Sequence, residues 1–455
     1  MLLDMKMHIS KDHIFTGFNF AWKSIYTLLT LFLVPIFLTQ EEQGYWFTIS
    51  SLAALIVLAD LGFSNIILQF AAHEFAHLRF NDGMSISGDK KYLRRLSSLF
   101  VFSIKWVGSI LLFAFPCIVI IGLFLLGQKT STASWIAPWI IYVFGSSIMF
   151  LNSTLLFFFE GCNSIAISQK IRMFMSILMG AILSATLIFG FKLYALSFSL
   201  FLSSLLGLYL IFKVFRKSIV SFVEISRQHK HSWRKEFIPL FWKYAISWGS
   251  GYFLFQMYTP LMFHYEGAIA AGKIGMSITV WLGVFSLSNV WMYVITPRIN
   301  KLVYRCEWGL LDKLFFKNLK LSGLTFCIGA SMIFWILFFF KDRILLIDRL
   351  ADMTTLFFLA AGWFLQIVVN AFAIYLRAHK EEPLLLPSFL SALYVVFTTF
   401  LCAKYLSTDY FFLGYLSSYV WGIPWIYTIY NKKRKSHLDG FYINPTAAYN
   451  SNSNV

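Results

Sequence analysis

The sequence predicts an all-α polytopic membrane protein. Of its 455 residues, 58% are hydrophobic and only 13% are charged, and the mean hydropathy is +0.69. Soluble globular domains carry about 25% charged residues, so the composition excludes an ordinary soluble protein. The apolar residues also gather into runs of about 20, the length that an α-helix needs to cross a bilayer.

Reading the apolar runs along the chain gives about twelve transmembrane helices. The expected spans cover residues 14–38, 45–70, 97–126, 135–159, 173–191, 193–211, 244–265, 274–297, 321–340, 354–376, 384–403 and 411–430. The longest predicted outer loop, residues 341–353, is short. We read the first run as a retained span, because it is too long for a signal peptide and no cleavage site follows it.

The basic residues predict which side each loop faces. Of the 38 Lys and Arg residues, 29 fall in the polar segments that include both termini, and 7 fall in the opposite segments. The side richer in Lys and Arg is normally cytoplasmic, so both termini are predicted to be cytoplasmic. This topology and the anionic lipids of the inner leaflet explain the net charge of +17, and we expect no nucleic-acid partner.

Several residues of the first half recur in the second half. Trp22, Pro35, Gly44, Ser64 and Asn65 recur in order as Trp248, Pro260, Gly267, Ser288 and Asn289, at spacings of 223 to 226 residues, and Asn152 recurs as Asn370. Six spans separate the copies, so both halves enter the membrane in the same direction, as in a parallel duplication. Chance recurrence in a Trp-rich chain is the alternative.

The repeat predicts two six-helix lobes with a MATE-like arrangement. The N-terminal lobe covers residues 1–216, a cytoplasmic linker covers 217–240, the C-terminal lobe covers 241–431, and a basic and then disordered tail covers 432–455. Two similar bundles that face one another are typical of an alternating-access transporter. We therefore expect a transporter and not an enzyme.

Pro35 and Pro260 are predicted at equivalent depths in the first and seventh spans. A proline inside a spanning helix frees a carbonyl group and bends the helix axis. Such a helix either flexes during gating or carries a fixed kink that improves packing. The sequence leaves both interpretations open.

Three charged residues, Lys23, Asp60 and Lys105, fall inside the first three predicted spans. At 1.5 Å per residue, each lies roughly 12 to 15 Å from the predicted cytoplasmic end, so one layer could hold all three. Asp60 neutralises one lysine at most, which leaves a positive charge that would attract an anion. The alternative is that the lysines reach the headgroups and Asp60 only bridges helices.

One motif indicates a different class of protein. His73-Glu74-Phe75-Ala76-His77 matches HExxH, in which two histidines bind zinc and the glutamate is the general base. An intramembrane protease also needs an aspartate in a later span, but the matching Leu438-Asp439-Gly440 lies in the hydrophilic tail. We therefore predict an amphipathic interfacial helix here and no metal. The five cysteines lack paired spacing, so no disulfide framework is expected.

Segments along nearly the whole chain together resemble a known transporter family. They are residues 44–52, Ala59-Asp-Leu-Gly-Phe-Ser-Asn65, 159–161, 251–256 followed by Pro260 and 265–267, and Leu376-Arg-Ala-His-Lys-Glu-Glu-Pro383. In these segments the chain resembles the polysaccharide-transporter (Wzx-like) branch of the multidrug and oligosaccharidyl-lipid exporter superfamily.

The resemblance implies a flippase of a bacterial inner membrane. Its substrate would be an undecaprenyl-pyrophosphate-linked oligosaccharide, such as an O-antigen repeat unit for lipopolysaccharide. The implied cationic cavity would use Lys23, Lys105 and Lys243, the last at the mouth of the seventh span, and Asp60 would be the ion-pair or coupling group. No cofactor is expected beyond an H⁺ or Na⁺ gradient. The expected partners are the lipid-linked substrate, membrane lipids, and the polysaccharide polymerase with its chain-length machinery.

Two further classes stay open. An ion-coupled exporter of drugs or other small molecules on the same fold would use Asp60 as its coupling carboxylate. A membrane glycosyltransferase or polymerase usually needs sizeable outer loops that carry acids or arginines, and the predicted outer loops are short.

Overall fold

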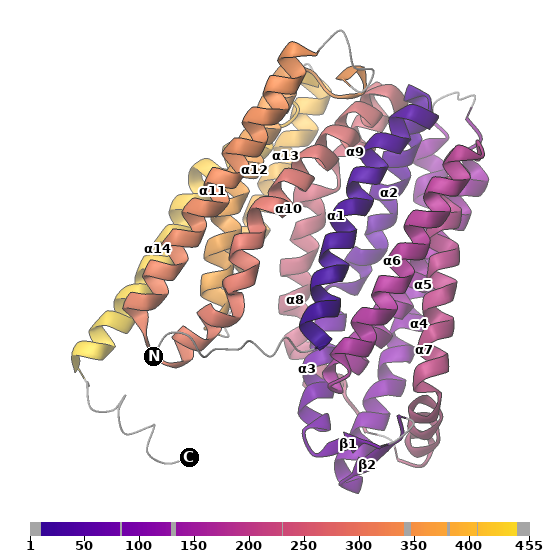
Figure 1. Ribbon diagram of the computed structural model, residues 1–455, viewed down its shortest axis with the longest axis vertical. Helices are drawn as coiled ribbons and strands as arrows, with labels where there is room; N and C mark the ends of the chain where they lie inside the picture. Colours follow the sequence, from indigo (N-terminus) through magenta and orange to yellow (C-terminus); the bar gives the residue numbers. More distant parts are fainter. Residues whose placement is uncertain are drawn as a thin grey trace. The chain divides into compact units, whose positions relative to one another are not determined.

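The computed structural model describes residues 11–81, 84–128, 133–229, 231–340, 347–379, 383–406 and 408–443. These residues form helices α1 to α14, one β-hairpin and two short 3-10 turns (Figure 1). The chain divides into two compact units: residues 1–252 with 259–272, and residues 253–258 with 273–455.

The first unit contains most of the N-terminal helices. They are α1 (Lys11–Phe37), α2 (Gln40–Asp60), α3 (Phe63–Phe75), α4 (Lys90–Leu126), α5 (Ile136–Gly161), α6 (Ile165–Ile188), α7 (Leu193–Gln228), most of α8 (Arg234–Phe255) and most of α9 (Tyr258–Glu266). Strands β1 (Leu78–Phe80) and β2 (Ile86–Gly88) join α3 to α4 as an antiparallel hairpin, with Leu78 opposite Gly88.

The second unit contains the remaining helices. They are α10 (Ala268–Tyr304), whose first turn belongs to the first unit, α11 (Trp308–Phe339), α12 (Met353–Arg377), α13 (Leu385–Tyr405) and α14 (Leu413–Ile443), with the 3-10 turns η1 (Ile347–Arg349) and η2 (Thr408–Tyr410). Since α14 continues to Ile443, the first part of the predicted tail is helical. Residues 444–455 lie outside the described part of the chain.

The helices confirm a polytopic helical membrane protein. Among the residues that the structure describes, eight helices are long and apolar enough to cross a membrane, namely α4, α5, α6, α7, α10, α11, α12 and α13. A shorter apolar stretch, Ile25–Phe37, lies in α1. Large apolar side chains such as Phe113 and Phe338 are exposed on their outer faces. An apolar surface of this extent is favourable in contact with lipid and unfavourable in contact with water.

Two predicted spans are not continuous helices, so the expectation of single helices over 45–70 and 244–265 is wrong. The second span breaks between α2 and α3, where Leu61 and Gly62 have φ values of 45° and 78°. A residue in this left-handed region ends an α-helix, and glycine adopts it readily. The seventh span breaks between α8 and α9 at Gln256 and Met257. The other ten spans each fall on one helix, and several of these helices, such as α7, α11 and α14, extend more than ten residues beyond the predicted span.

The boundary between the two compact units differs from the boundary between the predicted lobes. Residues 241–252 and 259–272, expected in the C-terminal lobe, pack with the first unit. The lobes describe a sequence repeat, whereas the units describe packing. The boundary of the repeat therefore stays a prediction.

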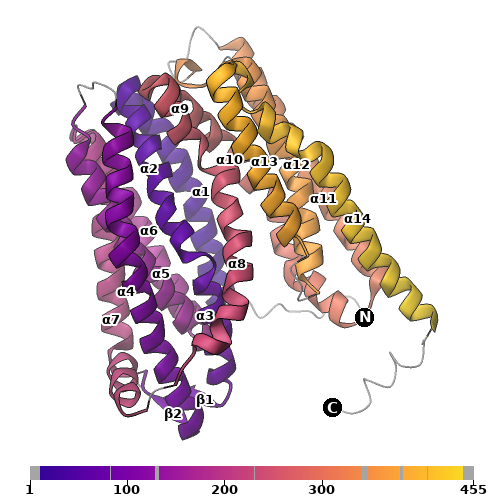
Figure 2. The ribbon, with the colours of Figure 1, turned by 180° about the vertical axis from the view of Figure 1, so that it is seen from behind.

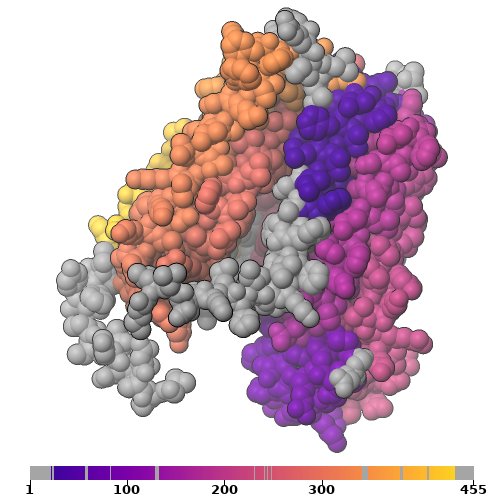
Figure 3. All heavy atoms as spheres, in the orientation of Figure 1, coloured from indigo at the N-terminus to yellow at the C-terminus, as the bar shows by residue number. Residues whose placement is uncertain are grey.

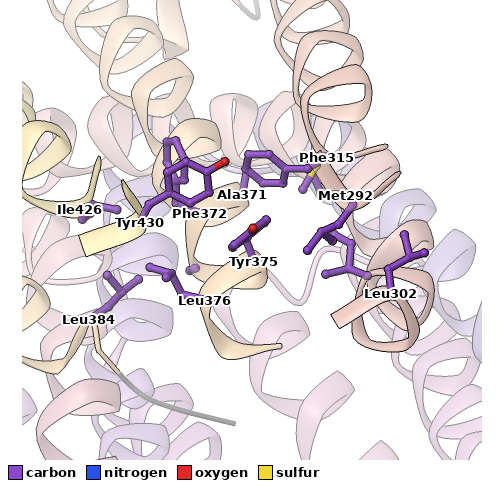
Figure 4. Close-up of a cluster of buried hydrophobic side chains, with 13 residues drawn as sticks. Met292, Leu302, Phe315, Ala371, Phe372, Tyr375, Leu376, Leu384, Ile426 and Tyr430 are labelled. Carbon is purple, nitrogen blue, oxygen red and sulfur yellow. The ribbon is translucent and has the colours of Figure 1, made fainter. Parts of the chain in front are cut away.

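Each unit has its own core. In the first unit α5 packs on α7, α6 packs on α1 and α7, and α3 packs on α5 (Figures 1 and 2). In the second unit Phe315 of α11, Phe372 and Tyr375 of α12 and Tyr430 of α14 meet in one buried cluster (Figure 4). Burying such aromatic side chains contributes much of the packing energy of a helical bundle.

An ion pair links the starts of α2 and α7 in the first unit. Lys192 Nζ lies 2.8 Å from Glu42 Oε1. The other carboxylate oxygen of Glu42 accepts a hydrogen bond of 3.0 Å from the Thr39 amide, and the Thr39 hydroxyl accepts one of 3.2 Å from the Glu42 amide. This reciprocal arrangement is a capping box at the start of α2. Burial alone would raise the pKa of Glu42, but the hydrogen bonds from Lys192 and Thr39 outweigh it and lower the pKa.

The variant Glu42→Gln should lower the thermal stability of the detergent-solubilised protein at pH 7. Glutamine keeps the capping hydrogen bonds and removes the charge that pairs with Lys192. A carboxyl group with a lowered pKa stabilises the fold above its unfolded pKa, and this stability is lost as the pH falls through the folded pKa. The difference in melting temperature between variant and wild type should therefore shrink below about pH 4. An equal difference at pH 7 and pH 3 would contradict this role.

Candidate functional site

The carboxylate of Asp60 lies at the break between α2 and α3. Its Oδ1 accepts hydrogen bonds from the Ser64 amide at 3.1 Å and from the Ser64 hydroxyl at 2.7 Å, and the Gly62 amide also donates to it. The first amides of a helix have no intrahelical acceptor and form the positive end of its dipole. Asp60 therefore caps α3, although it precedes the first residue of that helix by three positions.

Three other helices surround this break within the first unit. Ser64 Oγ lies 3.3 Å from Thr154 Oγ1 of α5. Phe63 stacks on Trp106 of α4, with ring centroids 5.7 Å apart. A Cβ atom on Gly62 would lie only 2.9 Å from the side chain of Trp248 in α8. The break is therefore a packed feature of the unit, held by α4, α5 and α8.

The structure describes one side chain of the predicted cationic cavity. Lys105 is exposed on α4, immediately before Trp106, whose ring stacks on Phe63 three residues after Asp60. Asp60, the last residue of α2, and Lys105 of α4 thus flank the contact between Phe63 and Trp106, and a shared layer of charge at this depth stays a prediction. In the described part of the chain, no ion pair joins them.

The other two lysines of the predicted cavity belong to described helices. Lys23 lies in α1 and Lys243 lies in α8, but their side chains fall outside the described residues. Their contribution to a cationic cavity stays a prediction.

The two predicted kink prolines lie near helix ends. Pro35 is buried in α1, two residues before its end, and Pro260 is buried in the first turn of α9. A proline in a first turn removes an amide that has no intrahelical partner anyway. Pro260 therefore lies at the start of the helix that follows the break in the seventh span. Its role in gating stays a prediction.

A polar contact joins the second and fourth predicted spans of each half, through residues that the repeat does not pair. Asn370 Nδ2 of α12 donates to Asn289 Oδ1 of α10 at 2.9 Å. In the first half, Ser64 of α3 contacts Thr154 of α5. Both contacts join the second and fourth predicted spans of a half. Asn152, the predicted counterpart of Asn370, instead donates to a carbonyl of α7 at 2.7 Å.

The residues of the HExxH match do not converge on a metal site. The His73 side chain is 78% exposed, and His77 stacks on Tyr92. Glu74 is buried and accepts a 2.9 Å hydrogen bond from Arg95. Among the residues that the structure describes, no group of His, Cys, Asp and Glu could hold a metal ion. The segment forms the end of α3 and the turn into β1.

Sequence reasoning missed the cluster in which Arg95 takes part. Arg95 pairs with Glu74 and, at 3.1 Å, with Glu236, which lies 2.9 Å from His231. The guanidinium also lies over the Trp233 ring, 4.7 Å from its centroid. Burial alone would raise the pKa of Glu236, but the hydrogen bond with His231 and the charge of Arg95 outweigh it and lower the pKa. The cluster fastens the start of α8 to α3 and α4.

Solved transporter structures match the fold of this chain. No protein-family model and no curated protein matches the sequence. An inward-facing multidrug resistance MATE family transporter of the MOP superfamily matches with a TM-score of 0.60 at 11% identity, covering 91% of this chain and 99% of that one. The chain has the MATE fold.

Two further solved structures agree on the fold. A MOP superfamily transporter from Pyrococcus furiosus, described as having a binding pocket of reverse polarity, matches with a TM-score of 0.55 at 13% identity, over 94% of this chain and 96% of that one. A MATE structure in complex with MaL6 gives 0.54 at 14% identity, over 95% and 96%. The predicted MATE-like arrangement is thereby confirmed.

The variants Gly62→Ala and Gly190→Ala should separate packing at the break from backbone strain. Both glycines are left-handed, with φ of +78° and +77°, but only Gly62 has heavy atoms of neighbouring residues within 4 Å of an added Cβ. Left-handed alanine costs roughly 1–2 kcal/mol at either position. Because Gly62→Ala also displaces Trp248, it should lower the melting temperature by clearly more than Gly190→Ala. Equal losses would show that α8 does not hold the break.

Proposed function

We propose that this chain is an alternating-access transporter that flips an undecaprenyl-pyrophosphate-linked oligosaccharide to the outer leaflet of a bacterial inner membrane. The MATE fold supports transport, since the structures that share it include inward-facing and outward-facing conformations of a multidrug resistance MATE transporter. The sequence resemblance to the polysaccharide-transporter branch supports the lipid-linked substrate. An O-antigen repeat unit for lipopolysaccharide is one such cargo, and the polymerase and chain-length machinery would use the flipped product.

The charge balance beside the break favours an anionic substrate. Asp60 is held by the amides of α3, so the positive end of that helix already compensates its charge. Lys105 is exposed on the neighbouring helix and has no ion pair with Asp60. Its positive charge is therefore available to a ligand. A pyrophosphate carries several negative charges, and lysine is a common phosphate ligand.

A second candidate is an ion-coupled exporter of small molecules. The structures with this fold include transporters titled as multidrug resistance proteins. In addition, Asp60 occupies a helix discontinuity, and transporters often bind their coupling ions where a spanning helix is interrupted. Protonation of Asp60 would weaken the hydrogen bonds that it accepts from the amides at the start of α3. Proton binding would thereby be coupled to the conformation of the break.

Lys105→Ala should abolish complementation of a flippase-deficient strain, because it removes the exposed charge next to the break. Lys105→Arg keeps the charge and should retain most activity. Lys90→Ala is a matched control, since Lys90 is exposed at the start of the same helix. Membrane insertion and expression are measured for all three variants. Full activity of Lys105→Ala would overturn the charge mechanism.

A pair of variants at Asp60 distinguishes a helix cap from a coupling carboxylate. Asparagine caps a helix nearly as well as aspartate, whereas alanine costs about 1 kcal/mol. If Asp60 serves mainly as a cap, Asp60→Asn should keep transport and Asp60→Ala should lower the melting temperature. Loss of transport in the properly folded Asp60→Asn variant would instead identify a coupling carboxylate, which the exporter requires.

A further inference from the structure

One face of α11 in the second unit carries three lysines and then a long apolar stripe. Lys313, Lys317 and Lys320 are all exposed. Along the same helix, the side chains of Leu324, Ile328, Trp335 and Phe338 are 55% to 73% exposed. The orange surface in Figure 3 includes this helix. The opposite face, including Leu311, Phe315 and Phe326, is buried in the unit.

The lysines and the apolar residues form one continuous stripe. With 3.6 residues per turn, Lys313, Lys317 and Lys320 fall within about 60° of one another around the helix axis. Leu324, Ile328, Trp335 and Phe338 extend the same stripe within about 80°. The lysines cover about 10 Å along the axis and the apolar part covers about 21 Å. The lysines can thus lie at the headgroups, and the apolar part, which is longer than the about 15 Å of hydrocarbon in one leaflet, can cover the acyl chains of that leaflet.

The three lysines take no part in the ion pairs of the described residues of the second unit. Asp312, the nearest acid in sequence, points to the other side and pairs with Arg434 of α14 at 2.7 Å. Glu307, before the start of α11, pairs with Arg305 at 3.8 Å. None of the ion pairs among the described residues includes Lys313, Lys317 or Lys320. The stripe therefore begins with three positive charges that have room for an anionic partner.

We infer that this face of α11 binds an anionic phospholipid of the bilayer. The phosphate of the headgroup contacts the lysines, and an acyl chain lies along Leu324, Ile328 and Trp335. A free phosphate would use the lysines but not the apolar stripe, and a zwitterionic lipid would use the stripe without the full charge. The lysines lie on the side predicted to be cytoplasmic, where anionic lipids attract basic residues near the membrane surface. The inference does not depend on which cargo the protein transports.

Native mass spectrometry of the full-length protein tests the inference. The protein is released from nanodiscs of phosphatidylcholine that contain phosphatidylglycerol, and the affinity of the retained phosphatidylglycerol is measured. Each lysine near the surface contributes about a fivefold factor, so Lys317→Gln should weaken retention about fivefold. The triple variant Lys313→Gln/Lys317→Gln/Lys320→Gln should weaken it at least about twentyfold.

The control removes three exposed positive charges that do not share one helix face, since Lys90 and Lys91 are about 100° apart on α4 and Lys235 lies on α8. Lys90, Lys91 and Lys235 are exposed in the first unit, and their triple glutamine variant should retain phosphatidylglycerol within about twofold of wild type. Equal loss in both triple variants, or no loss in the α11 variant, would overturn the inference. Because the lysines are exposed, the graded single variant Lys317→Gln reports on binding even if the triple variant folds poorly.

Two further outcomes of the binding measurement identify the molecule that occupies this face. Phosphatidylcholine retained as tightly as phosphatidylglycerol would show an apolar contact without headgroup recognition, and would overturn the inference. Undecaprenyl pyrophosphate could instead displace phosphatidylglycerol from the wild-type protein and not from the α11 triple variant. That result would identify the face as a docking site for substrate and would overturn the inference. Transport activity is assayed separately with the same variants, so failure of lipid binding and failure of the proposed transport are distinguishable.

Discussion

The structure of the first unit depends on satisfying the backbone where the second span breaks. Hydrocarbon offers no partner to the free amides at the start of a helix, so a break inside a membrane needs protein acceptors. Asp60 provides one through its bonds with Gly62 and Ser64. The stacking of Trp106 on Phe63 then holds the start of α3 in place. A charged residue deep in a span thus has a structural role here, and no ion pair among the described residues includes Lys105.

The two halves of the chain are alike in some features and differ in others. By the predicted repeat, α2 with α3 corresponds to α10, and α1 corresponds to α8 with α9. The first half breaks its second span, whereas the second half breaks its first. The polar contact between the second and fourth spans is present in both, through Ser64 in one and Asn289 in the other. The two halves therefore share an interhelical polar contact and differ in the position of the helix break.

Hydropathy predicted the membrane class and the ten continuous spans because a helix is the ordinary solution for 20 apolar residues in lipid. It missed the break at Leu61 and Gly62 because the hydrogen-bond ladder is interrupted there while the apolar run continues. Gly62 was an available signal, and so was the short spacing from Asp60 to Ser64. The pairing of Arg95 with Glu236 had no such signal, since 141 residues separate them. Contacts of that kind are set by tertiary packing and not by local pattern.

Reconstitution into proteoliposomes measures the proposed transport most directly. A labelled undecaprenyl-pyrophosphate oligosaccharide is incorporated in both leaflets, and its accessibility to a membrane-impermeant glycosidase is followed under proton and sodium gradients. With the wild-type protein, accessibility should rise beyond the outer-leaflet fraction, and with Lys105→Ala it should not. An unchanged accessible fraction with correctly inserted wild-type protein under every gradient would contradict the flippase and direct attention to small-molecule export.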